Sequence, residues 1–343
     1  MKYKLFGKSG LRVSEICLGT MTFGQEWELG AGYEDSKKVF DVFVNAGGNF
    51  IDTANRYTEG TSEKWVGEFI SSDRDHFVLA TKYTLHDRRD DPNFNGNHRK
   101  NLFRSVDGSL KRLKTDYIDL LWVHVWDFTT APEEVMRSLD DIISSGKVHY
   151  IGISDTPAWI VSRANTISEM KGWHAFTGLQ IEYSLIQRTP ERELLPMAKS
   201  LDIAVTPWAP LGGGTLTGKY LNENTSNGRL PADSKRRNEQ AMKIAKEVVA
   251  VAKELGKSPA EIAINWTRQK DQVIIPIIGA RYENQIKEWI GCVDFTIPDE
   301  LMKILDEVSK IDLGFPHEFL RNPSIQDVIF GGTQDKIIRH KEF

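Results

Sequence analysis

The chain has 343 residues and a mass of 38.9 kDa, enough for two average domains or for one large α/β barrel. With 40% hydrophobic and 27% charged residues, its composition is that of an ordinary globular protein. The formal net charge of −4 and the pI near 6.1 give no electrostatic reason to expect binding to nucleic acid or to an anionic membrane.

Targeting and metal-binding signals are missing from the sequence. The first ten residues lack the apolar core of a signal peptide, and no segment approaches the ~18 apolar residues of a membrane-spanning helix. Cys17 and Cys292 cannot form a disulfide framework or a Cys-rich metal site, and the eight histidines show no H-x-H or H-E-x-x-H pairing. We therefore expect a cytoplasmic protein without a metal. The sequence gives no basis for an oligomeric state.

Short apolar runs alternate with amphipathic stretches along the chain, which is typical of a parallel sheet wrapped by helices. We predict eight strands, each followed by a helix. These strands are predicted at residues 14–19, 49–52, 77–81, 118–124, 148–153, 178–182, 203–207 and 273–277. Eight such units in one chain favour a (β/α)₈ TIM barrel over the alternative, an open doubly wound sheet. We expect the whole chain, residues 1–343, to form one domain.

Signals at the ends of several elements add detail to this barrel. Residues 2–6 and 11–13 flank Gly7-Lys8-Ser9-Gly10, which predicts an N-terminal β-hairpin that closes the barrel floor. Ser258-Pro259-Ala260-Glu261 combines an N-cap serine, a first-turn proline and a capping-box glutamate. The segment 130–133 repeats this pattern with Thr130 as the cap, before a predicted helix at 133–145.

Long polar loops follow the first, third and seventh predicted strands. They span residues 22–35, 84–98 and 212–237. In a parallel barrel these loops rise from the catalytic face, so we expect them to form the walls of a substrate site. The tail at 313–343 has no clean periodicity, and we expect it to fold over the same face.

Four polar residues lie at the ends of consecutive predicted strands or directly after them. Asp52, Lys82 and His124 each close an apolar run, and Tyr57 follows Asp52 by five residues. If these runs are parallel neighbours, all four side chains meet at the carboxyl edge of the sheet. The ammonium would then favour loss of the phenolic proton, lowering a tyrosine pKa of about 10 by on the order of 1–3 units. We expect Asp52 to hold Lys82 charged and His124 to hydrogen-bond the substrate oxygen or the phenol.

Each of these residues also has a structural interpretation when it is considered alone. Lys82 would be an ordinary ion-pair partner, His124 a hydrogen-bonded core histidine, and Asp52 the start of a turn. Tyr57 alone carries no information. Only their convergence on one sheet edge favours acid–base chemistry.

Together with the motifs around them, these four residues make the sequence resemble the aldo-keto reductase superfamily over nearly its whole length. The spacing is most similar to the bacterial branch grouped with aryl-alcohol dehydrogenases and potassium-channel β-subunits. The motifs that carry the resemblance are Leu18-Gly19-Thr20-Met21, Phe50-Ile51-Asp52-Thr53-Ala54 through Tyr57, Leu79-Ala80-Thr81-Lys82, Asp116-Tyr117-Ile118-Asp119-Leu120 to His124, Gly152-Ile153-Ser154, Gln180-Ile181-Glu182-Tyr183-Ser184, Trp208-Ala209-Pro210-Leu211, Leu216-Thr217-Gly218-Lys219-Tyr220 and Pro276-Ile277-Ile278-Gly279-Ala280-Arg281.

The resemblance implies NADPH-dependent reduction of aldehydes or ketones. Hydride would pass from nicotinamide C4 to the carbonyl carbon while Tyr57 protonates the oxygen, and NADPH would be preferred over NADH. Asp52, Tyr57, Lys82 and His124 would be the catalytic residues. The resemblance also implies the residues that bind the cofactor. The nicotinamide half would contact Gly19, Thr20 and Met21 at the ribose, Ser154, Asp155 and Gln180 at the carboxamide, and Trp208 on the ring, with Asp52 also among the cofactor residues. The other half would contact Ala209, Pro210, Leu211, Gly213 and Lys219 at the pyrophosphate, and Gly279, Arg281, Gln285 and Glu288 at the adenosine phosphate.

This chain departs from the family pattern in its cofactor residues. Asp155 stands where the family usually has Asn, and a carboxylate accepts hydrogen bonds but cannot donate one to the carboxamide oxygen. Trp289 occupies a position where an adenine-contacting Asn is common, and Ala209 replaces a frequent Ser. For Trp208, the structural alternative to ring stacking is simple core packing.

Other functions for this constellation can be weighed from the sequence. A Schiff-base aldolase would also place a lysine at a barrel strand end, but it needs neither Tyr57 nor a nicotinamide site. A redox-sensing regulatory subunit that binds NADPH and turns over slowly is the stronger alternative. The aromatic side chains Trp27, Tyr83 and Trp126 lie in or beside the catalytic-face loops, which predicts a pocket for aromatic or apolar carbonyl compounds.

Overall fold

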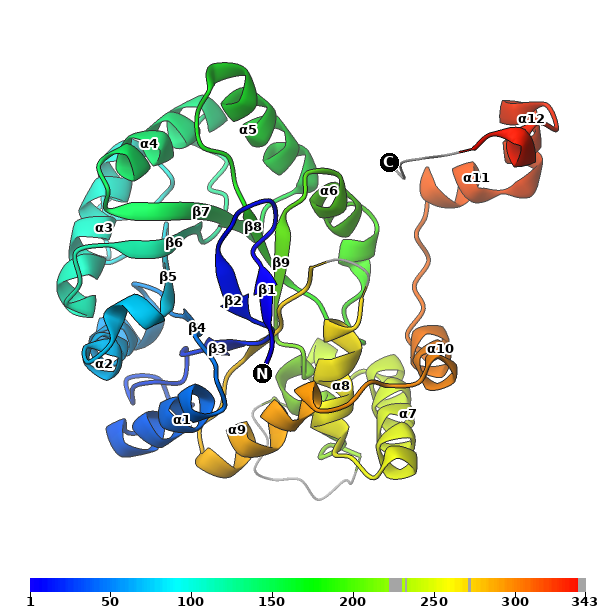
Figure 1. Cartoon of the computed structure of the whole chain (residues 1–343), viewed down its shortest axis with the longest axis horizontal. Helices are drawn as coiled ribbons and strands as arrows, with labels where there is room; N and C mark the ends of the chain where they lie inside the picture. The colour runs from blue at the N-terminus through cyan, green and yellow to red at the C-terminus, as the bar shows by residue number, and fades with distance from the viewer. Residues whose placement is uncertain (222–229, 232, 271–272, 339–343) are drawn as a thin grey trace.

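The structure is a computed structural model that describes residues 1–221, 230–231, 233–270 and 273–338. Its centre is a sheet of eight parallel strands ringed by helices (Figure 1). In spatial order the strands are β10 (Ile277–Ile278), β3 (Cys17–Gly19), β4 (Phe50–Asp52), β5 (Val78–Tyr83), β6 (Ile118–Val123), β7 (Val148–Ser154), β8 (Gly178–Glu182) and β9 (Ala204–Trp208).

The two ends of this sheet meet, which closes the barrel. A parallel bridge joins Val205 of β9 to Ile274, just before β10, and the Ile275 N–H donates to the Val205 carbonyl at 2.9 Å. The predicted (β/α)₈ barrel is therefore confirmed, and the open doubly wound sheet is wrong. The interior is filled by apolar side chains, as expected of a packed barrel rather than a pore.

An antiparallel hairpin closes one end of the barrel, as predicted. Its strands β1 (Tyr3–Leu5) and β2 (Arg12–Ser14) pair from Tyr3 with Ser14 to Leu5 with Arg12. Phe6, at the turn, is fully buried, and its ring lies 5.7 Å from that of Phe50 and 6.2 Å from that of Trp122. The strand predicted at 14–19 is in fact divided, because Ser14 ends the hairpin and the barrel strand begins only at Cys17.

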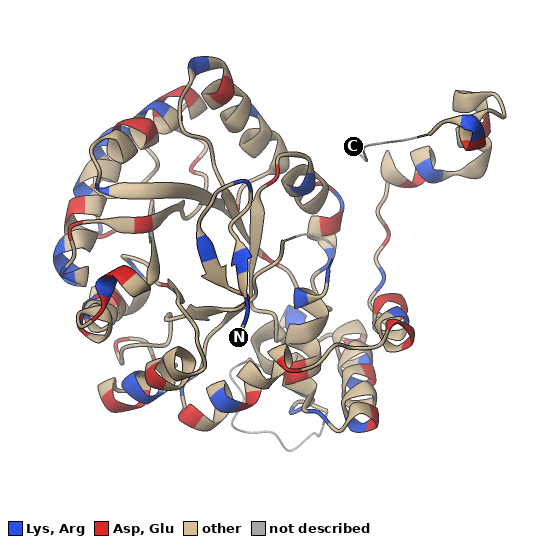
Figure 2. Ribbon diagram, in the orientation of Figure 1, with Lys and Arg blue, Asp and Glu red and all other residues tan. Residues whose placement is uncertain are grey.

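The outer helices bury an apolar face and carry their charges outward (Figure 2). In α4, for example, Val135, Leu139 and Ile142 are fully buried. The helices of the barrel are α1 (Tyr33–Asn45), α2 (Thr61–Ile70), α3 (Arg99–Leu113), α4 (Pro132–Ser144), α5 (Ala158–Lys171), α6 (Leu194–Ser200), α7 (Glu239–Leu255), α8 (Pro259–Arg268), α9 (Glu283–Ile290) and α10 (Asp299–Val308). None of the helices in the described ranges is long and apolar enough to span a bilayer.

One of the two predicted helix caps is confirmed. Ser258 Oγ accepts from the Glu261 N–H at 3.2 Å, and the Glu261 carboxylate accepts from the Ser258 N–H at 2.8 Å, so α8 has a complete capping box. The Thr130 cap is wrong. Helix α4 has Ala131 at its N-cap, and the Thr130 hydroxyl donates instead to Asp127 at 2.8 Å.

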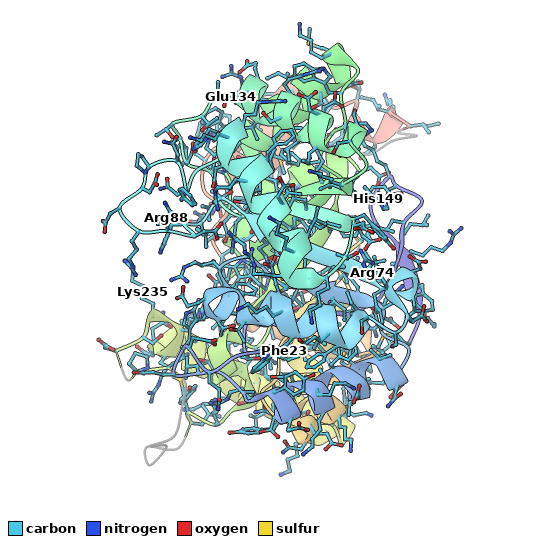
Figure 3. The ribbon with its side chains drawn as sticks, turned by 90° about the vertical axis from the view of Figure 1, so that its left-hand side faces the viewer. Phe23, Arg74, Arg88, Glu134, His149 and Lys235 are labelled. Carbon is cyan, nitrogen blue, oxygen red and sulfur yellow. The ribbon has the colours of Figure 1, made fainter. Side chains whose placement is uncertain are left out.

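The long loops rise together at the carboxyl ends of the strands. In Figure 3, Arg88 of the loop 84–98 and Lys235 of the loop 212–237 project on one side of the barrel, whereas Arg74 and His149 lie on the other side. Residues 222–229 and 232 of the second loop lie outside the described residues.

The C-terminal tail projects away from the barrel in Figure 1, as helices α11 (His317–Arg321) and α12 (Pro323–Phe330). Arg192 binds the Asp312 carbonyl at 2.6 Å, and His317 pairs with Glu193 at 3.0 Å, which holds the tail beside α6. No described tail residue lines the pocket at the catalytic face, so the expectation that the tail folds over this face is wrong. That residues 1–343 form one domain stays a prediction.

Candidate active site

The parallel register brings the four strand-end residues together. Asp52 ends β4, Lys82 is the last residue but one of β5, and His124 follows β6 directly. Asp52 pairs with Ala80, and Lys82 pairs with Trp122, so the three neighbouring strands end at one level. Tyr57 opens the short 3₁₀ helix η1 (Tyr57–Gly60), which follows β4.

Lys82 is the centre of a buried hydrogen-bond network. Its ammonium donates to Asp52 Oδ2 at 2.5 Å, to the Thr53 carbonyl at 2.8 Å and to Tyr57 Oη at 2.9 Å. An ammonium has three N–H donors, and here all three are used. Asp52 accepts a further bond from Gln180 Nε2 at 3.0 Å. A Schiff-base lysine needs a free neutral amine, so this arrangement does not suit the aldolase alternative.

Burial and charge act in opposite directions on these groups. Burial alone would lower the pKa of Lys82, but Asp52 and Tyr57 raise it above its ordinary value, so Lys82 is charged at neutral pH. Burial raises the pKa of Tyr57, and the opposing effect of Lys82 does not overcome it. The expectation of a depressed tyrosine pKa is therefore wrong for this structure. Tyr57 stays a protonated phenol, which is the state that a proton donor requires.

His124 faces the same pocket from the next strand. Its ring centroid lies 6.0 Å from that of Tyr57, with the two rings nearly perpendicular. Burial, and then the charge of Lys82, hold the pKa of His124 well below its usual range, so the imidazole is neutral. Its Nδ1 atom is buried and has no hydrogen-bond partner among the described residues. The expected roles of Asp52, Tyr57, Lys82 and His124 in catalysis stay predictions.

The loop that carries Tyr57 has an unusual backbone. Thr58 and Glu59, which follow it, have positive φ angles of 46° and 54°, a region that non-glycine residues seldom adopt. The Thr58 hydroxyl donates to the Phe23 carbonyl at 2.6 Å and is fully buried, which fixes this conformation. Such strained positions gather at functional sites, where the surrounding structure holds them.

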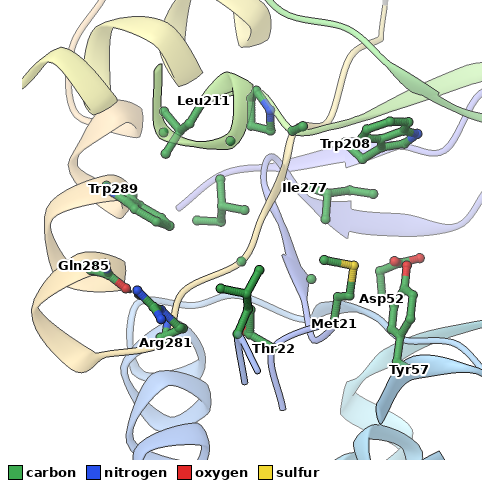
Figure 4. A pocket seen from close by; sticks show the side chains of 18 of the residues that line it. Met21, Thr22, Asp52, Tyr57, Trp208, Leu211, Ile277, Arg281, Gln285 and Trp289 are labelled. Atoms are coloured by element: carbon green, nitrogen blue, oxygen red, sulfur yellow. Dashed lines mark hydrogen bonds between the residues drawn. The ribbon is translucent and has the colours of Figure 1, made fainter. Parts of the chain in front are cut away.

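A cavity of about 730 Å³ opens at this end of the barrel. This volume lies within the range of small-molecule and cofactor sites. Figure 4 shows Arg281, Gln285 and Trp289 on one side of the cavity and Asp52 and Tyr57 on the opposite side. The cavity therefore connects the hydrogen-bonded tyrosine to the start of α9.

Most of the expected cofactor residues lie on the wall of this cavity. Those on the wall are Gly19, Met21, Asp52, Ser154, Asp155, Gln180, Trp208, Ala209, Pro210, Leu211, Gly213, Lys219, Gly279, Arg281, Gln285 and Glu288. Thr20 does not line it. This side chain is fully buried, and its hydroxyl bonds to the Asp52 carbonyl at 3.1 Å and to Ser62 at 2.8 Å. Thr22, which the sequence did not single out, lines the wall beside Met21.

The expected substrate residues are divided between the pocket and the core. Trp27 lines the cavity, with its ring centroid 6.3 Å from that of Tyr57. Tyr83 and Trp126 do not line it, and their part in substrate binding stays a prediction. Both are buried in the hydrophobic core, and the Tyr83 hydroxyl donates to the Asn97 carbonyl at 3.3 Å. The loop leucines Leu29 and Leu85 line the cavity instead.

Sequence reasoning also missed Arg236. This residue belongs to the short helix η5 (Lys235–Arg237), lines the cavity, and lies with its guanidinium carbon 5.6 Å from the Trp208 ring centroid. It forms an ion pair with Glu182 at 2.6 Å. The run of three basic residues at 235–237, within a loop already expected at the catalytic face, is the signal that could have identified it.

The wall has features that fit a nicotinamide dinucleotide. Ser154 Oγ is buried on the wall without a hydrogen-bond partner among the described residues. A Cβ atom at Gly19 would lie 2.7 Å from Ile277 Cγ2, so glycine at this position lets the wall residue Ile277 pack closely against β3. No carboxylate in the described ranges lies within ion-pair distance of Arg281. Its guanidinium, on the cavity wall, can therefore bind a phosphate.

Comparison with known proteins agrees with this geometry. The model of the aldo/keto reductase family matches residues 15–310. The chain is 39% identical to norsolorinic acid reductase of Aspergillus flavus, over 92% of this chain and 83% of that protein. It is 37% identical to an NADP(+) aryl-alcohol dehydrogenase of Phanerodontia chrysosporium, over 97% and 89%, and 36% identical to an aryl-alcohol dehydrogenase of Pestalotiopsis microspora, over 93% and 85%.

These relatives bear out the similarity to aryl-alcohol dehydrogenases but not the bacterial grouping. All three are fungal proteins, so the assignment to a bacterial branch has no support. With the family model covering most of the barrel and relatives of this identity matching along the chain, the protein belongs to the aldo/keto reductase family of NAD(P)H-dependent oxidoreductases.

Proposed function

We propose that this protein reduces aromatic aldehydes or ketones to alcohols, with NADPH as the hydride donor and Tyr57 as the general acid. The observation that carries the proposal is the buried Asp52–Lys82–Tyr57 hydrogen-bond network, which opens into a cavity of about 730 Å³. When bound, NADPH supplies the hydride that reduces the carbonyl carbon. Ser154 and Gln180 would hold its carboxamide, and Trp208 would lie against the nicotinamide ring.

The chain's own residues supply the proton. Tyr57 Oη gives its proton to the carbonyl oxygen, so that the hydride and the proton together convert the carbonyl group to an alcohol. The charged Lys82, 2.9 Å from Tyr57 Oη, stabilises the phenolate that remains. His124 is held neutral, and in that state it retains one N–H that can hydrogen-bond the substrate oxygen.

An aromatic substrate is favoured by the wall beyond Tyr57. Trp27, Leu29 and Leu85 provide apolar surface from two different loops. An aromatic ring can pack edge-to-face against Trp27, a contact worth about 0.5–1.5 kcal/mol beyond simple burial. The names of the relatives, aryl-alcohol dehydrogenase and norsolorinic acid reductase, are consistent with this substrate class.

The preference for NADPH over NADH is proposed from the other end of the cavity. Arg281 lies two residues before helix α9, where a cation alone is unfavourable because helix N-termini attract negative charge. The 2′-phosphate of NADPH would remove this conflict by binding between the arginine and the helix amides. NADH lacks that phosphate and should therefore bind more weakly.

A turnover assay tests the proposal. Purified protein is mixed with NADPH and a panel of carbonyl compounds, from substituted benzaldehydes to aldose sugars, and the decrease of the NADPH absorbance band is followed. We expect oxidation of NADPH with the aromatic members and the corresponding alcohol as product. Tight binding of NADPH without turnover on any member would contradict the proposal and favour a regulatory, redox-sensing role.

A further inference from the structure

Asp155 carries a carboxylate into the catalytic end of the cavity. It follows β7 directly and adopts a positive φ of 41°, a conformation that Asp and Asn tolerate better than other side chains. Its Oδ1 accepts a hydrogen bond from Trp208 Nε1 at 3.1 Å. The side chain is exposed and lines the cavity, so a ligand bound there can contact it.

The charges around Asp155 leave its own charge uncompensated. The charge of Lys82, on β5, acts on Asp155 from a distance, but the three Lys82 donors serve Asp52, Thr53 and Tyr57. On the other flank, Glu182 of β8 is neutralised by Arg236.

The other titratable groups at this end do not change this balance. Tyr57 is protonated and His124 is neutral, so neither adds a charge. The ion pairs Lys82–Asp52 and Arg236–Glu182 each sum to zero, which leaves the carboxylate of Asp155 as one net negative charge. Among the described residues, no cation lies within ion-pair distance of Asp155.

We propose that Asp155 determines which redox state of the cofactor the site prefers, favouring the positively charged nicotinamide ring of NADP⁺ over the neutral ring of NADPH. The inference rests on the proposed function, and it deepens it. Asp155 adjoins Ser154 and contacts Trp208, which are the residues that would hold the carboxamide and the ring. An unpaired carboxylate in a partly enclosed site attracts a cation and is indifferent to a neutral ring.

Backbone conformation alone does not require a carboxylate at this position. Asn adopts positive φ as readily as Asp does, and an Asn side chain could also accept the hydrogen bond from Trp208. Asp155→Asn therefore removes the charge while it keeps the backbone conformation and the acceptor. This makes the substitution a clean test of the charge.

The preference should also depend on pH. Burial raises the pKa of Asp155 to about 6, and the hydrogen bond from Trp208 opposes this only in part. Below this pH Asp155 is protonated and its attraction for the cation is lost, so NADP⁺ affinity should increase relative to NADPH affinity as the pH rises from 5 to 8. The 2′-phosphate also titrates near pH ~6, but it is common to both cofactors and cancels in the ratio of their dissociation constants.

The test measures dissociation constants for NADP⁺ and NADPH by tryptophan fluorescence between pH 5 and 8. For the wild type we expect the ratio Kd(NADPH)/Kd(NADP⁺) to increase with pH. At pH 8, Asp155→Asn should lower this ratio about 10-fold, at the low end of the effect of a nearby opposite charge, and should remove its pH dependence.

A matched control is Glu288→Gln, which removes a carboxylate from the adenosine end of the same cavity. This substitution should change both dissociation constants equally and leave their ratio unaltered. If Asp155→Asn binds both cofactors but keeps the wild-type ratio and pH dependence, the role of Asp155 is overturned while the proposed function stands. If the wild type binds neither cofactor, the proposed function itself fails.

Discussion

Tyr57 contributes to the site both the packing of its ring and the proton of its hydroxyl, and replacement by phenylalanine removes only the second. Tyr57→Phe keeps the ring against Trp27 and His124 but removes the proton donor. We expect carbonyl reduction to fall by ~10²–10⁴-fold, because this is the usual contribution of a general acid, while NADPH affinity changes little. Initial rates and a fluorescence titration with NADPH measure the two effects separately.

Tyr117→Phe is the matched control for this substitution. It also removes a hydrogen-bonded phenol hydroxyl, the one donated to Asp75 at 2.6 Å, but this residue lies before β6, at the floor end of the barrel. The control should keep wild-type activity. A Tyr57→Phe protein with more than half of the wild-type rate would show that Tyr57 is not the acid.

Lys82 and Asp52 form a buried ion pair whose loss should affect stability as well as activity. Lys82→Met leaves the Asp52 carboxylate buried without its cation, which typically costs about 3–5 kcal/mol of unfolding free energy. The double variant Asp52→Asn/Lys82→Met removes both charges and should recover part of that stability, yet it should remain inactive. Urea unfolding and rate assays on the three proteins decide this. A double variant as unstable as the single one would mean that charge burial is not the cause.

Arg281 should strengthen the binding of NADPH but not the binding of NADH. Losing a charge-assisted hydrogen bond to phosphate costs about 1.5–3 kcal/mol, so Arg281→Met should weaken NADPH binding roughly 10–150-fold and leave NADH binding nearly unchanged. Lys287→Met is the control, because it removes an exposed charge from α9, the helix that begins two residues after Arg281, where Lys287 pairs with Glu283. Equal losses for NADPH and NADH would show that Arg281 does not bind the phosphate.

At the scale of single residues, the sequence predicts which side chains lie together better than it predicts how deeply each one is buried. The strand-end pattern brought Asp52, Lys82 and Tyr57 together, because the period of a parallel sheet fixes which positions share an edge. It did not predict the raised pKa of Tyr57, since burial depends on loops far away in the chain. The burial of Tyr83 in the core could not be predicted for a related reason: the sequence does not show whether a strand-end aromatic side chain turns toward the pocket or toward the outer helices.

For helices and strands too, features set by neighbouring residues were predicted, whereas features set by the surrounding fold were not. Ser258 was predicted correctly as a cap because its partner Glu261 is three residues away, so the motif is local. The Thr130 cap failed because Asp127 competes for the Thr130 hydroxyl, and a turn upstream is set by the fold around it. The divided strand at 14–19 has a similar cause, because the sequence does not reveal that the hairpin uses Ser14.

The capping box of α8 yields a prediction at this scale. Ser258→Ala removes the acceptor for the Glu261 N–H and should lower the unfolding free energy by about 0.5–2 kcal/mol without affecting cofactor binding. Ser72→Ala, at an exposed position outside any cap, is the control and should stay within about 0.5 kcal/mol of the wild type. Thermal or urea unfolding compares the two. Equal stability of the two variants would show that the cap contributes nothing measurable.

At the scale of the whole molecule, the tail is the part that the sequence predicted least well. The barrel follows from eight repeated units, whose order and spacing leave few alternatives. The tail has no such repetition, so nothing in its pattern specifies where it packs. Its described residues include large apolar side chains that are strongly exposed, among them Phe315 at 84% and Val328 at 80%.

Removal of residues 314–343 tests whether the tail matters to the site. The truncated chain keeps Asp312, whose carbonyl binds Arg192, and loses no described residue of the cavity wall. We therefore expect NADPH affinity and the rate of carbonyl reduction to stay at wild-type values. Self-association, measured by size-exclusion chromatography with light scattering, should decrease because exposed apolar surface is removed. A truncated protein that melts like the wild type but loses NADPH affinity would show that the tail reaches the catalytic face, and the separation of barrel and tail described above would then be incorrect.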